Sequence, residues 1–280
     1  MGHVKIITDS AGDLSAETAT SLGLTVLPLQ IQFGSKVYRD GIEITSDDFF
    51  ERAARSTALP SILPPPQKLF DDTYAELMRQ TDSIVAIHSA AKLSQTFRVA
   101  QRSAMPLLGR AKIVVIDSQL IGIGLGMLVT AAARAAEEGA TLDEVVRLTR
   151  GLIPHIYLAF FADTLDYLEH SGRIRKAQAI LGGMLNIKPL LIMEDGDLVA
   201  LEKVRTRTKA IEKLVEFIVE FAKIERMLIL HSDSTEDIPL FIEQINLALP
   251  NINIQMAKYG PALGAHIGPG ALGVVVYEGT

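Results

Sequence analysis

Near the end of the chain, one histidine lies in a run rich in glycine, Gly264-Ala265-His266-Ile267-Gly268-Pro269-Gly270. Histidine changes between neutral and charged forms near pH 7, and glycine lets the backbone approach a small ligand closely. An apolar strand is predicted directly after this run, at residues 273–277. The pattern predicts a loop that holds a titratable donor against a ligand. The motif alone slightly favours the alternative, a loop that only leads into the strand.

Polar residues also follow three predicted strands in the first half of the chain. The strands at residues 4–9, 83–88 and 111–117 end in Asp9-Ser10, His88-Ser89 and Asp117-Ser118. Helical patterns separate these strands, which is typical of parallel βαβ units. Ligands of such sheets bind beyond the carboxyl ends of the strands. The sequence therefore predicts a ligand site at that edge.

The pattern changes after residue 154, where closely spaced strands and a hairpin turn at residues 194–197 indicate an α+β region. We expect an N-terminal Rossmann-like α/β domain at 1–155, with a projecting hairpin insertion at about 27–60. A C-terminal α+β domain is expected at 156–280. Residues 25–33 are predicted as one strand, and residues 177–184 as a helix. Four prolines lie at residues 59–66, which predicts a stiff extended loop there rather than a strand.

Composition excludes several classes of function. The chain has no cysteine, so disulfides, thiolate zinc sites and thiol nucleophiles are excluded. Its net charge of −6 argues against a nucleic-acid-binding surface, and its histidines lack metal-ligand spacing. No apolar run reaches the roughly 18 residues of a membrane-spanning helix, and the first residues lead straight into a strand. We expect a cytoplasmic globular protein without metal, cofactor or stable membrane insertion.

Three motifs suggest other chemistry. Serines, Asp9, Asp117 and His266 could form a hydrolytic triad, but the Gly-x-Ser-x-Gly signature is absent. The glycines at residues 122–126 depart from the dinucleotide-binding spacing and favour close packing of a helix on the sheet. Basic residues cluster at 173–176 and 203–209, which indicates an anionic ligand or an acidic partner. For the second cluster, a solvated strand face is about equally favoured.

Taken in order, eight short segments resemble the DegV family over essentially the whole chain. No single segment is decisive, but together they are highly specific. They are Thr8-Asp9-Ser10, Tyr38-Arg39-Asp40-Gly41, Lys92-Leu93-Ser94 with Thr96, Ile116-Asp117-Ser118, Leu168-Glu169-His170-Ser171-Gly172-Arg173-Ile174, Leu185-Asn186-Ile187-Lys188-Pro189-Leu190, Lys203-Val204-Arg205-Thr206 and the segment from His266 to Gly273.

The resemblance implies two α/β domains with a long-chain fatty acid in a tunnel between them. It implies a carrier, not an enzyme, that presents the acyl carboxylate to a separate ATP-dependent fatty acid kinase. That kinase makes an acyl phosphate for phospholipid synthesis. Arg173 and Arg205 match arginines that the family uses towards the kinase or its phosphate, and His266 matches a histidine near the fatty-acid head group.

This chain departs from the family pattern at the expected head-group site. It has Ile62-Leu63-Pro64-Pro65 where the family usually has Thr-Ser-Gln-Pro. It has Ala90-Ala91-Lys92-Leu93-Ser94-Gln95-Thr96 where the family usually has Ser-Ser-x-Leu-Ser-Gly-Thr. Hydroxyls expected to hold the carboxylate are therefore lost at Ile62 and Ala91.

We expect Ser94, backbone N–H groups and His266 to hold the head group, with Ser89 as a further candidate. The apolar Ile62 and Ala91 would better tolerate a neutral or larger-headed acyl lipid, which is one alternative ligand. A second alternative is a serine hydrolase of acyl esters that uses Ser94 or Ser10 with His266. A third is a lipid sensor without coupling to a kinase.

Overall fold

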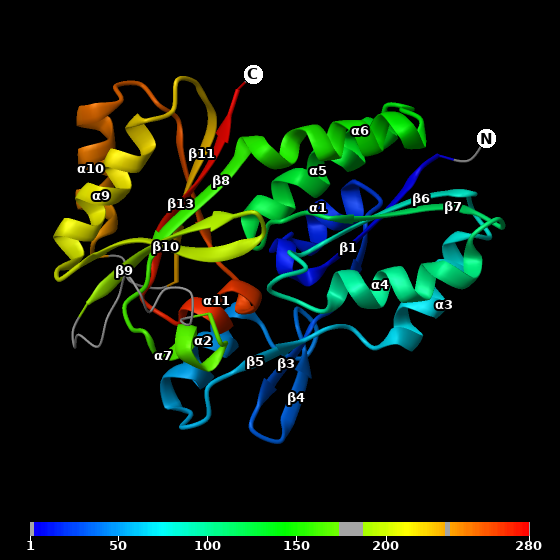
Figure 1. The fold of residues 1–280 in the computed structure, drawn as a ribbon, viewed down its shortest axis with the longest axis horizontal. Coiled ribbons are helices and arrows are strands. Elements are labelled where there is room, and N and C mark those ends of the chain that lie inside the picture. Colours follow the sequence, from blue (N-terminus) through cyan, green and yellow to red (C-terminus); the bar gives the residue numbers. More distant parts are fainter. Residues whose placement is uncertain (1–2, 174–186, 233–235, 280) are drawn as a thin grey trace. The chain divides into compact units, whose positions relative to one another are not determined.

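The structure is a computed structural model that describes residues 3–173, 187–232 and 236–279 (Figure 1). The chain forms two compact units. Unit 1 contains Met1–Thr45, Pro60–Pro154 and Asp195–Asp197, and unit 2 contains Ser46–Leu59, His155–Glu194 and Leu198–Thr280. The parallel-sheet N-terminal region and the C-terminal region of sheet and helices confirm the predicted mixed α/β class.

A four-stranded parallel sheet forms the centre of unit 1. Its order is β2-β1-β6-β7, from β1 (Lys5–Asp9), β2 (Thr25–Leu27), β6 (Ser83–His88) and β7 (Lys112–Asp117). Asp9 pairs with Leu27, and His88 pairs with Asp117. The predicted polar strand ends therefore lie at one edge of the sheet.

Helices cover both faces of this sheet because its central strands are apolar on both sides. On one face, Phe70 and Tyr74 pack with Ile7, Ala86 and other buried side chains. The helical elements of unit 1 are η1 (Ser10–Gly12), α1 (Ala16–Ser21), α3 (Gln67–Leu77), α4 (Thr96–Ala104), η2 (Met105–Leu107), α5 (Ile123–Glu137) and α6 (Leu142–Leu152). The 3-10 turn η3 (Ile153–His155) follows α6.

The glycines at residues 122–126 serve close packing, as the sequence favours. A Cβ atom on Gly126 would lie 2.3 Å from the carbonyl oxygen of Gly12. Only glycine allows helix α5 to approach η1 and the end of β1 at this distance.

A small antiparallel sheet of order β4-β3-β5 corrects two predictions. Its strands are β3 (Gln30–Phe33), β4 (Lys36–Arg39) and β5 (Ser61–Leu63). The strand predicted at 25–33 is broken at Pro28, which has no N–H, so β2 and β3 belong to different sheets. Residues 61–63 are not a loop, because three residues between prolines keep their N–H groups and pair with β3.

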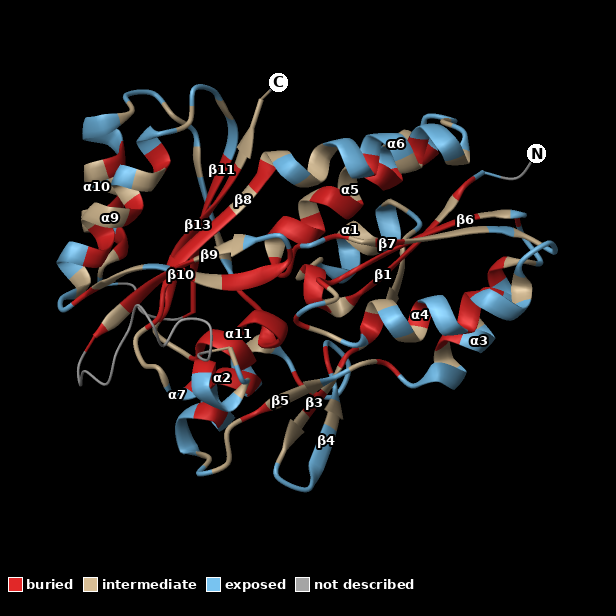
Figure 2. Ribbon diagram, in the orientation of Figure 1, coloured by how far each residue is buried: buried red, intermediate tan, exposed pale blue. Residues whose placement is uncertain are grey.

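Unit 2 is built on a six-stranded mixed sheet of order β10-β9-β8-β13-β11-β12. Helices α9 and α10 pack on one face of it (Figures 1 and 2). Leu214 and Phe241 of these helices are fully buried with side chains of the strands. The elements of unit 2 are α2 (Ser46–Arg55), β8 (Ile156–Phe161), α7 (Asp166–His170), β9 (Lys188–Glu194), β10 (Asp197–Val204), α9 (Arg207–Val219), β11 (Ile224–His231), α10 (Ile238–Ala248), β12 (Ile254–Lys258), α11 (Pro261–Ile267) and β13 (Leu272–Glu278).

The loop predicted around His266 is wrong, since residues 261–267 form helix α11. Pro261 occupies the first turn, where its fixed φ suits a helix, and the helix ends at Gly268, whose φ is +76°. The helix predicted at 177–184 lies outside the described residues, as do Arg175 and Lys176. Among the helices that the structure describes, none is long and apolar enough to cross a membrane.

Candidate functional site

The carboxylate of Asp9 organises the carboxyl edge of the parallel sheet. It is buried, and its Oδ1 accepts a hydrogen bond from the Ala11 N–H at 3.2 Å. Its Oδ2 lies 2.9 Å from His88 Nδ1, 3.0 Å from the Ser89 N–H and 3.3 Å from Ser89 Oγ. A buried carboxylate requires such donors. Asp9 therefore joins strands β1 and β6, and its carboxylate accepts a hydrogen bond from the Ser89 hydroxyl.

The loop between β6 and α4 brings Ser89, Ala91 and Ser94 together. The Ala91 N–H donates to Asp117 Oδ1 at 3.0 Å, which holds the loop over the end of β7. Ser94 Oγ accepts from the Thr96 N–H at 3.1 Å and lies 2.7 Å from Thr96 Oγ1. Ile62 lies on another element, strand β5, where it pairs with Ile31.

Asp40, at the base of the β3–β4 hairpin, is a second buried carboxylate near this edge. Its Oδ2 accepts a hydrogen bond from Ser10 Oγ at 2.6 Å, and Ser10 Oγ accepts from the Leu29 N–H at 3.0 Å. Burial, together with the negative charge of Asp9, raises the pKa of Asp40 to about 6. The hydrogen bonds from Ser10 and Gly41 only partly oppose this shift.

Replacing Asp40 with asparagine is expected to stabilise unit 1 by about 1–2 kcal/mol at pH 8. The folded-state pKa of about 6 exceeds the usual 3.8, so the folded protein takes up a proton between about pH 6 and 4. The unfolded chain does not, so Asp40 adds stability as the pH falls through this range. The asparagine variant lacks this gain.

Urea unfolding at pH 4.5, 6 and 8 measures this difference. The exposed carboxylate of Asp72 provides a control, and its change to asparagine is expected to leave the pH dependence unchanged. An asparagine variant of Asp40 that is less stable than the natural protein at pH 8 contradicts the prediction.

In unit 2, His266 is buried in the last turn of helix α11. Burial, together with the positive charge of Arg173, lowers the pKa of His266 to about 4. The side chain is therefore neutral at pH 7. Its Nδ1 has no hydrogen-bond partner among the described residues. A buried polar atom without a hydrogen-bond partner is unfavourable. The Nδ1 of His266 therefore marks a place where a ligand can supply the missing partner.

The segment after His266 is held by Tyr259, a buried residue that the sequence analysis did not single out. Its hydroxyl donates to the Gly268 carbonyl at 2.8 Å and accepts from the Ala271 N–H at 3.2 Å. Its ring lies edge-on to Phe50 of helix α2, with 5.3 Å between ring centroids. These contacts fix where helix α11 ends and therefore fix the backbone that carries His266.

An ionic cluster holds the next residues of this segment. Arg207 Nη1 donates to Asp163 Oδ1 at 2.9 Å and to the Gly270 carbonyl at 2.8 Å. Partial burial raises the pKa of Asp163, but hydrogen bonds from Lys188 and Arg207 outweigh burial and lower the pKa below its usual value. Lys188 lies in one of the eight family-like segments, and Arg207 lies in the basic run at 203–209. Their shared partner Asp163 is distant from both along the chain, so the cluster could not be predicted from the sequence.

The two predicted partner arginines lie in different surroundings within unit 2. Arg173 is partly buried after helix α7, close enough to His266 to affect its pKa. Arg205 is exposed between β10 and α9. The basic residues at 203–209 are thus divided between a strand, a loop and a helix and do not form one strand face.

A preformed serine–histidine pair is not found at the serines proposed for hydrolysis. Ser10 pairs with Asp40 and the Leu29 N–H, and Ser94 pairs with Thr96. Neither hydroxyl has a histidine partner within the described part of the chain. The described residues also contain no group of three or more metal-ligating side chains placed to hold an ion.

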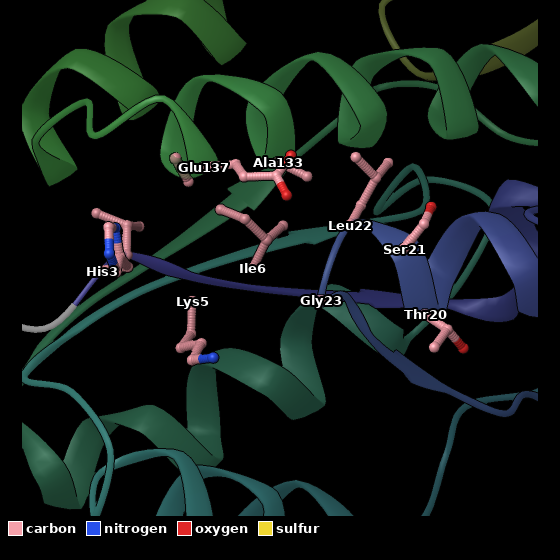
Figure 3. Close-up of a pocket in the computed structure, with 11 residues that line it drawn as sticks. His3, Lys5, Ile6, Thr20, Ser21, Leu22, Gly23, Ala133 and Glu137 are labelled. Atoms are coloured by element: carbon pink, nitrogen blue, oxygen red, sulfur yellow. The ribbon is translucent and has the colours of Figure 1, made fainter.

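A cavity of about 350 Å³ lies at the opposite end of β1 from Asp9 (Figure 3). The first strand, the end of α1 and helix α5 line it, with His3, Lys5, Ser21 and Glu137 among its polar residues. None of the site residues predicted from the sequence lines this cavity.

The comparison with known proteins decides the family. The family model described as uncharacterised protein, DegV family, matches residues 3–279. The chain belongs to the DegV family. A DegV domain-containing protein from Caldanaerobacter subterraneus is 34% identical to this DegV protein, over 99% of this chain and all of the relative. Another from Streptomyces coelicolor is also 34% identical, over 98% of each chain.

Solved DegV structures share the fold of this chain. A DegV family protein from Thermus thermophilus, described by its fatty acid binding, has a TM-score of 0.88 at 29% identity and 99% coverage of both chains. DegV from Bacillus subtilis, described as a fatty acid binding protein, has a TM-score of 0.86 at 26% identity, over 99% of this chain and 100% of the other. The resemblance stated from the short segments is therefore confirmed for the whole described fold.

Proposed function

We propose that this DegV protein binds a long-chain fatty acid and presents its carboxylate to a separate fatty acid kinase. The observation that carries the proposal is the buried, neutral His266, whose Nδ1 has no partner among the described residues. Relatives of the same fold are described as fatty acid binding. The tunnel expected between domains 1–155 and 156–280 is part of this proposal.

An anionic head group suits the surroundings of His266. A neutral imidazole carries one N–H, and a carboxylate oxygen would accept a hydrogen bond from it. The guanidinium of Arg173 lies near enough to disfavour a second positive charge on His266. The same guanidinium would favour a negative charge on the ligand. Both effects support a free carboxylate over a neutral head group.

Ser94 and Thr96 can supply a further donor. Two hydroxyls carry two hydrogens, and the hydrogen bond between Ser94 and Thr96 uses one of them. The other hydrogen can point to a ligand oxygen. Ser89 is less available because its N–H and hydroxyl both face Asp9. Since Ile62 and Ala91 offer no hydroxyl, His266 would contribute a larger share of head-group recognition than in relatives that keep those hydroxyls.

The acyl chain would supply most of the binding free energy. About fifteen buried methylenes at about 0.8 kcal/mol each give roughly 12 kcal/mol before the costs of association. A hydrogen bond to a charged group adds about 1.5–3 kcal/mol. The loss of one or two hydroxyls therefore weakens binding without abolishing it.

Replacing His266 with glutamine and Ser94 with alanine together is expected to lower fatty-acid affinity by roughly 100-fold. Titration with a fluorescent fatty acid after delipidation measures it. The matched control replaces exposed His3 with glutamine and exposed Ser15 with alanine, and should leave affinity unchanged. Unchanged affinity in the double variant would mean that His266 and Ser94 do not contact the head group.

Mass spectrometry of an organic extract of the purified protein tests the ligand itself. Near-stoichiometric free fatty acid is the expected result, and a protein that is empty and takes up none when offered contradicts the proposal.

Coupling to the kinase is tested separately by acyl-phosphate formation with ATP. Replacing exposed Arg205 with alanine should reduce this reaction while leaving affinity for fatty acid intact. A loaded protein that supports no acyl-phosphate formation would instead indicate a lipid sensor.

A further inference from the structure

A turn at the end of helix α4 places large apolar side chains in solvent. Met105 is 67% exposed and Leu108 is 65% exposed, whereas their neighbour Leu107 packs against the core of unit 1. Residues 105–107 form the 3-10 turn η2. Side chains three apart in a 3-10 helix project in the same direction. The turn therefore presents Met105 and Leu108 together, away from the sheet.

Three cations lie within four residues of these two side chains along the chain. Arg102, in the last turn of helix α4, precedes Met105 by three residues and lies on the same face. Arg110 and Lys112 follow Leu108 by two and four residues, and all three cations are exposed. Within the described residues, none of the three forms an ion pair. We call Arg102, Met105, Leu108, Arg110 and Lys112 the apolar–basic tip.

Two carboxylates lie beside Lys112, at one side of the tip. The backbone N–H of Lys112 donates to the Asp82 carbonyl at 2.7 Å, and Lys112 lines a pocket together with the exposed Asp82 and Asp143. Glu76 of helix α3 is already paired with Arg79. Three cations against the two carboxylates beside Lys112 leave a local positive charge, carried by Arg102 and Arg110, in a chain of net charge −6. The surface therefore complements an anionic partner.

We propose that the apolar–basic tip adsorbs reversibly to the surface of an anionic lipid bilayer. Interfacial binding combines apolar side chains at the acyl boundary with lysine and arginine against anionic head groups. The tip offers both on a protruding turn. An acidic protein would account for the three cations but would leave the exposed Met105 and Leu108 without an apolar surface to contact. The inference concerns a surface of unit 1 and does not require a bound fatty acid.

A tryptophan introduced at residue 108 tests insertion directly, because the chain has no tryptophan of its own. Leu108→Trp emission is expected to shift to shorter wavelength with phosphatidylglycerol vesicles and to be quenched by brominated lipid. The matched control is Leu247→Trp on helix α10, since Leu247 is 77% exposed. The control should show neither effect. Emission from position 108 that does not respond to phosphatidylglycerol vesicles overturns the proposal.

Co-sedimentation with vesicles separates the apolar and cationic contributions. The natural protein is expected to bind phosphatidylglycerol vesicles at least tenfold better than phosphatidylcholine vesicles, and less well as salt rises. Met105→Ser with Leu108→Ser should weaken binding at least tenfold, as should Arg102→Gln with Arg110→Gln and Lys112→Gln. Leu247→Ser should bind as the natural protein does.

Two outcomes would reject the lipid assignment. Equal binding by the serine variant and the natural protein would place lipid contact elsewhere on the chain. Equal binding to soluble polyglutamate, without loss in the serine variant, would indicate an acidic macromolecule. Because the vesicles contain no free fatty acid, either result leaves the proposed carrier function untouched.

Discussion

Replacing Asp9 with alanine is expected to lower the free energy of unfolding of unit 1 by about 3–5 kcal/mol. The carboxylate is buried and receives hydrogen bonds from Ala11, His88 and Ser89. Alanine would leave these donors without an acceptor in a site that excludes water, and each would lose a strong hydrogen bond. Native-state hydrogen exchange of amides in β1 and β6 measures the loss.

A double-mutant cycle with His88→Ala distinguishes the hydrogen bond from simple loss of volume. Because Asp9 and His88 interact directly, the double variant should be less destabilised than the sum of the single variants by about 1–3 kcal/mol. Additive effects would mean that His88 is not a partner of the carboxylate. Ser15→Ala, at an exposed helix cap, provides the background and should cost only about 1 kcal/mol.

Replacing Gly268 with alanine is expected to destabilise unit 2 by about 2–4 kcal/mol. The φ of Gly268 is +76°, a region unfavourable for residues with a Cβ, and the new Cβ would lie 2.6 Å from the ring of the buried Tyr167. Relief of this clash requires movement of Tyr167 or of the end of helix α11. The position of His266 should change with it, so fatty-acid affinity should fall in the same variant.

Gly172 supplies the matched control in the same unit. Its φ is +73°, but a Cβ there would meet nothing within 4 Å in the described part of the chain. Gly172→Ala should therefore cost about 1 kcal/mol, from the backbone conformation alone. Thermal unfolding compares the two variants. Equal losses at both glycines would contradict a role for the contact with Tyr167.

Most of the elements could be predicted from local pattern. Strands β1, β6 and β7 are short apolar runs ended by polar residues, and their alternation with helices predicts the parallel sheet. The errors lie where a local rule competes with tertiary pairing. The prolines around residues 61–63 suggest a loop, yet these three residues keep their N–H groups and pair with strand β3.

In the candidate site too, local sequence pattern identifies the residues, and tertiary contacts determine their surroundings. Asp9 and His88 are visible as polar strand ends, but their contact joins residues 79 positions apart and needs the parallel register of β1 and β6. His266 stands out in the sequence as a histidine among glycines. Its helical setting, its burial and its lowered pKa depend on contacts from Tyr259, Gly268 and Arg173.

The sequence by itself determined the family, the mixed α/β class and the residue types available for a head group. Those properties depend on short segments and on hydrophobic periodicity, which are local. Only the tertiary structure decided which hydroxyls can still bind a ligand. The Ser89 hydroxyl donates to Asp9, whereas the hydroxyls of Ser94 and Thr96 bond to each other. The tertiary structure also decided that His266 is neutral, because desolvation and a neighbouring charge arise from residues distant in the chain.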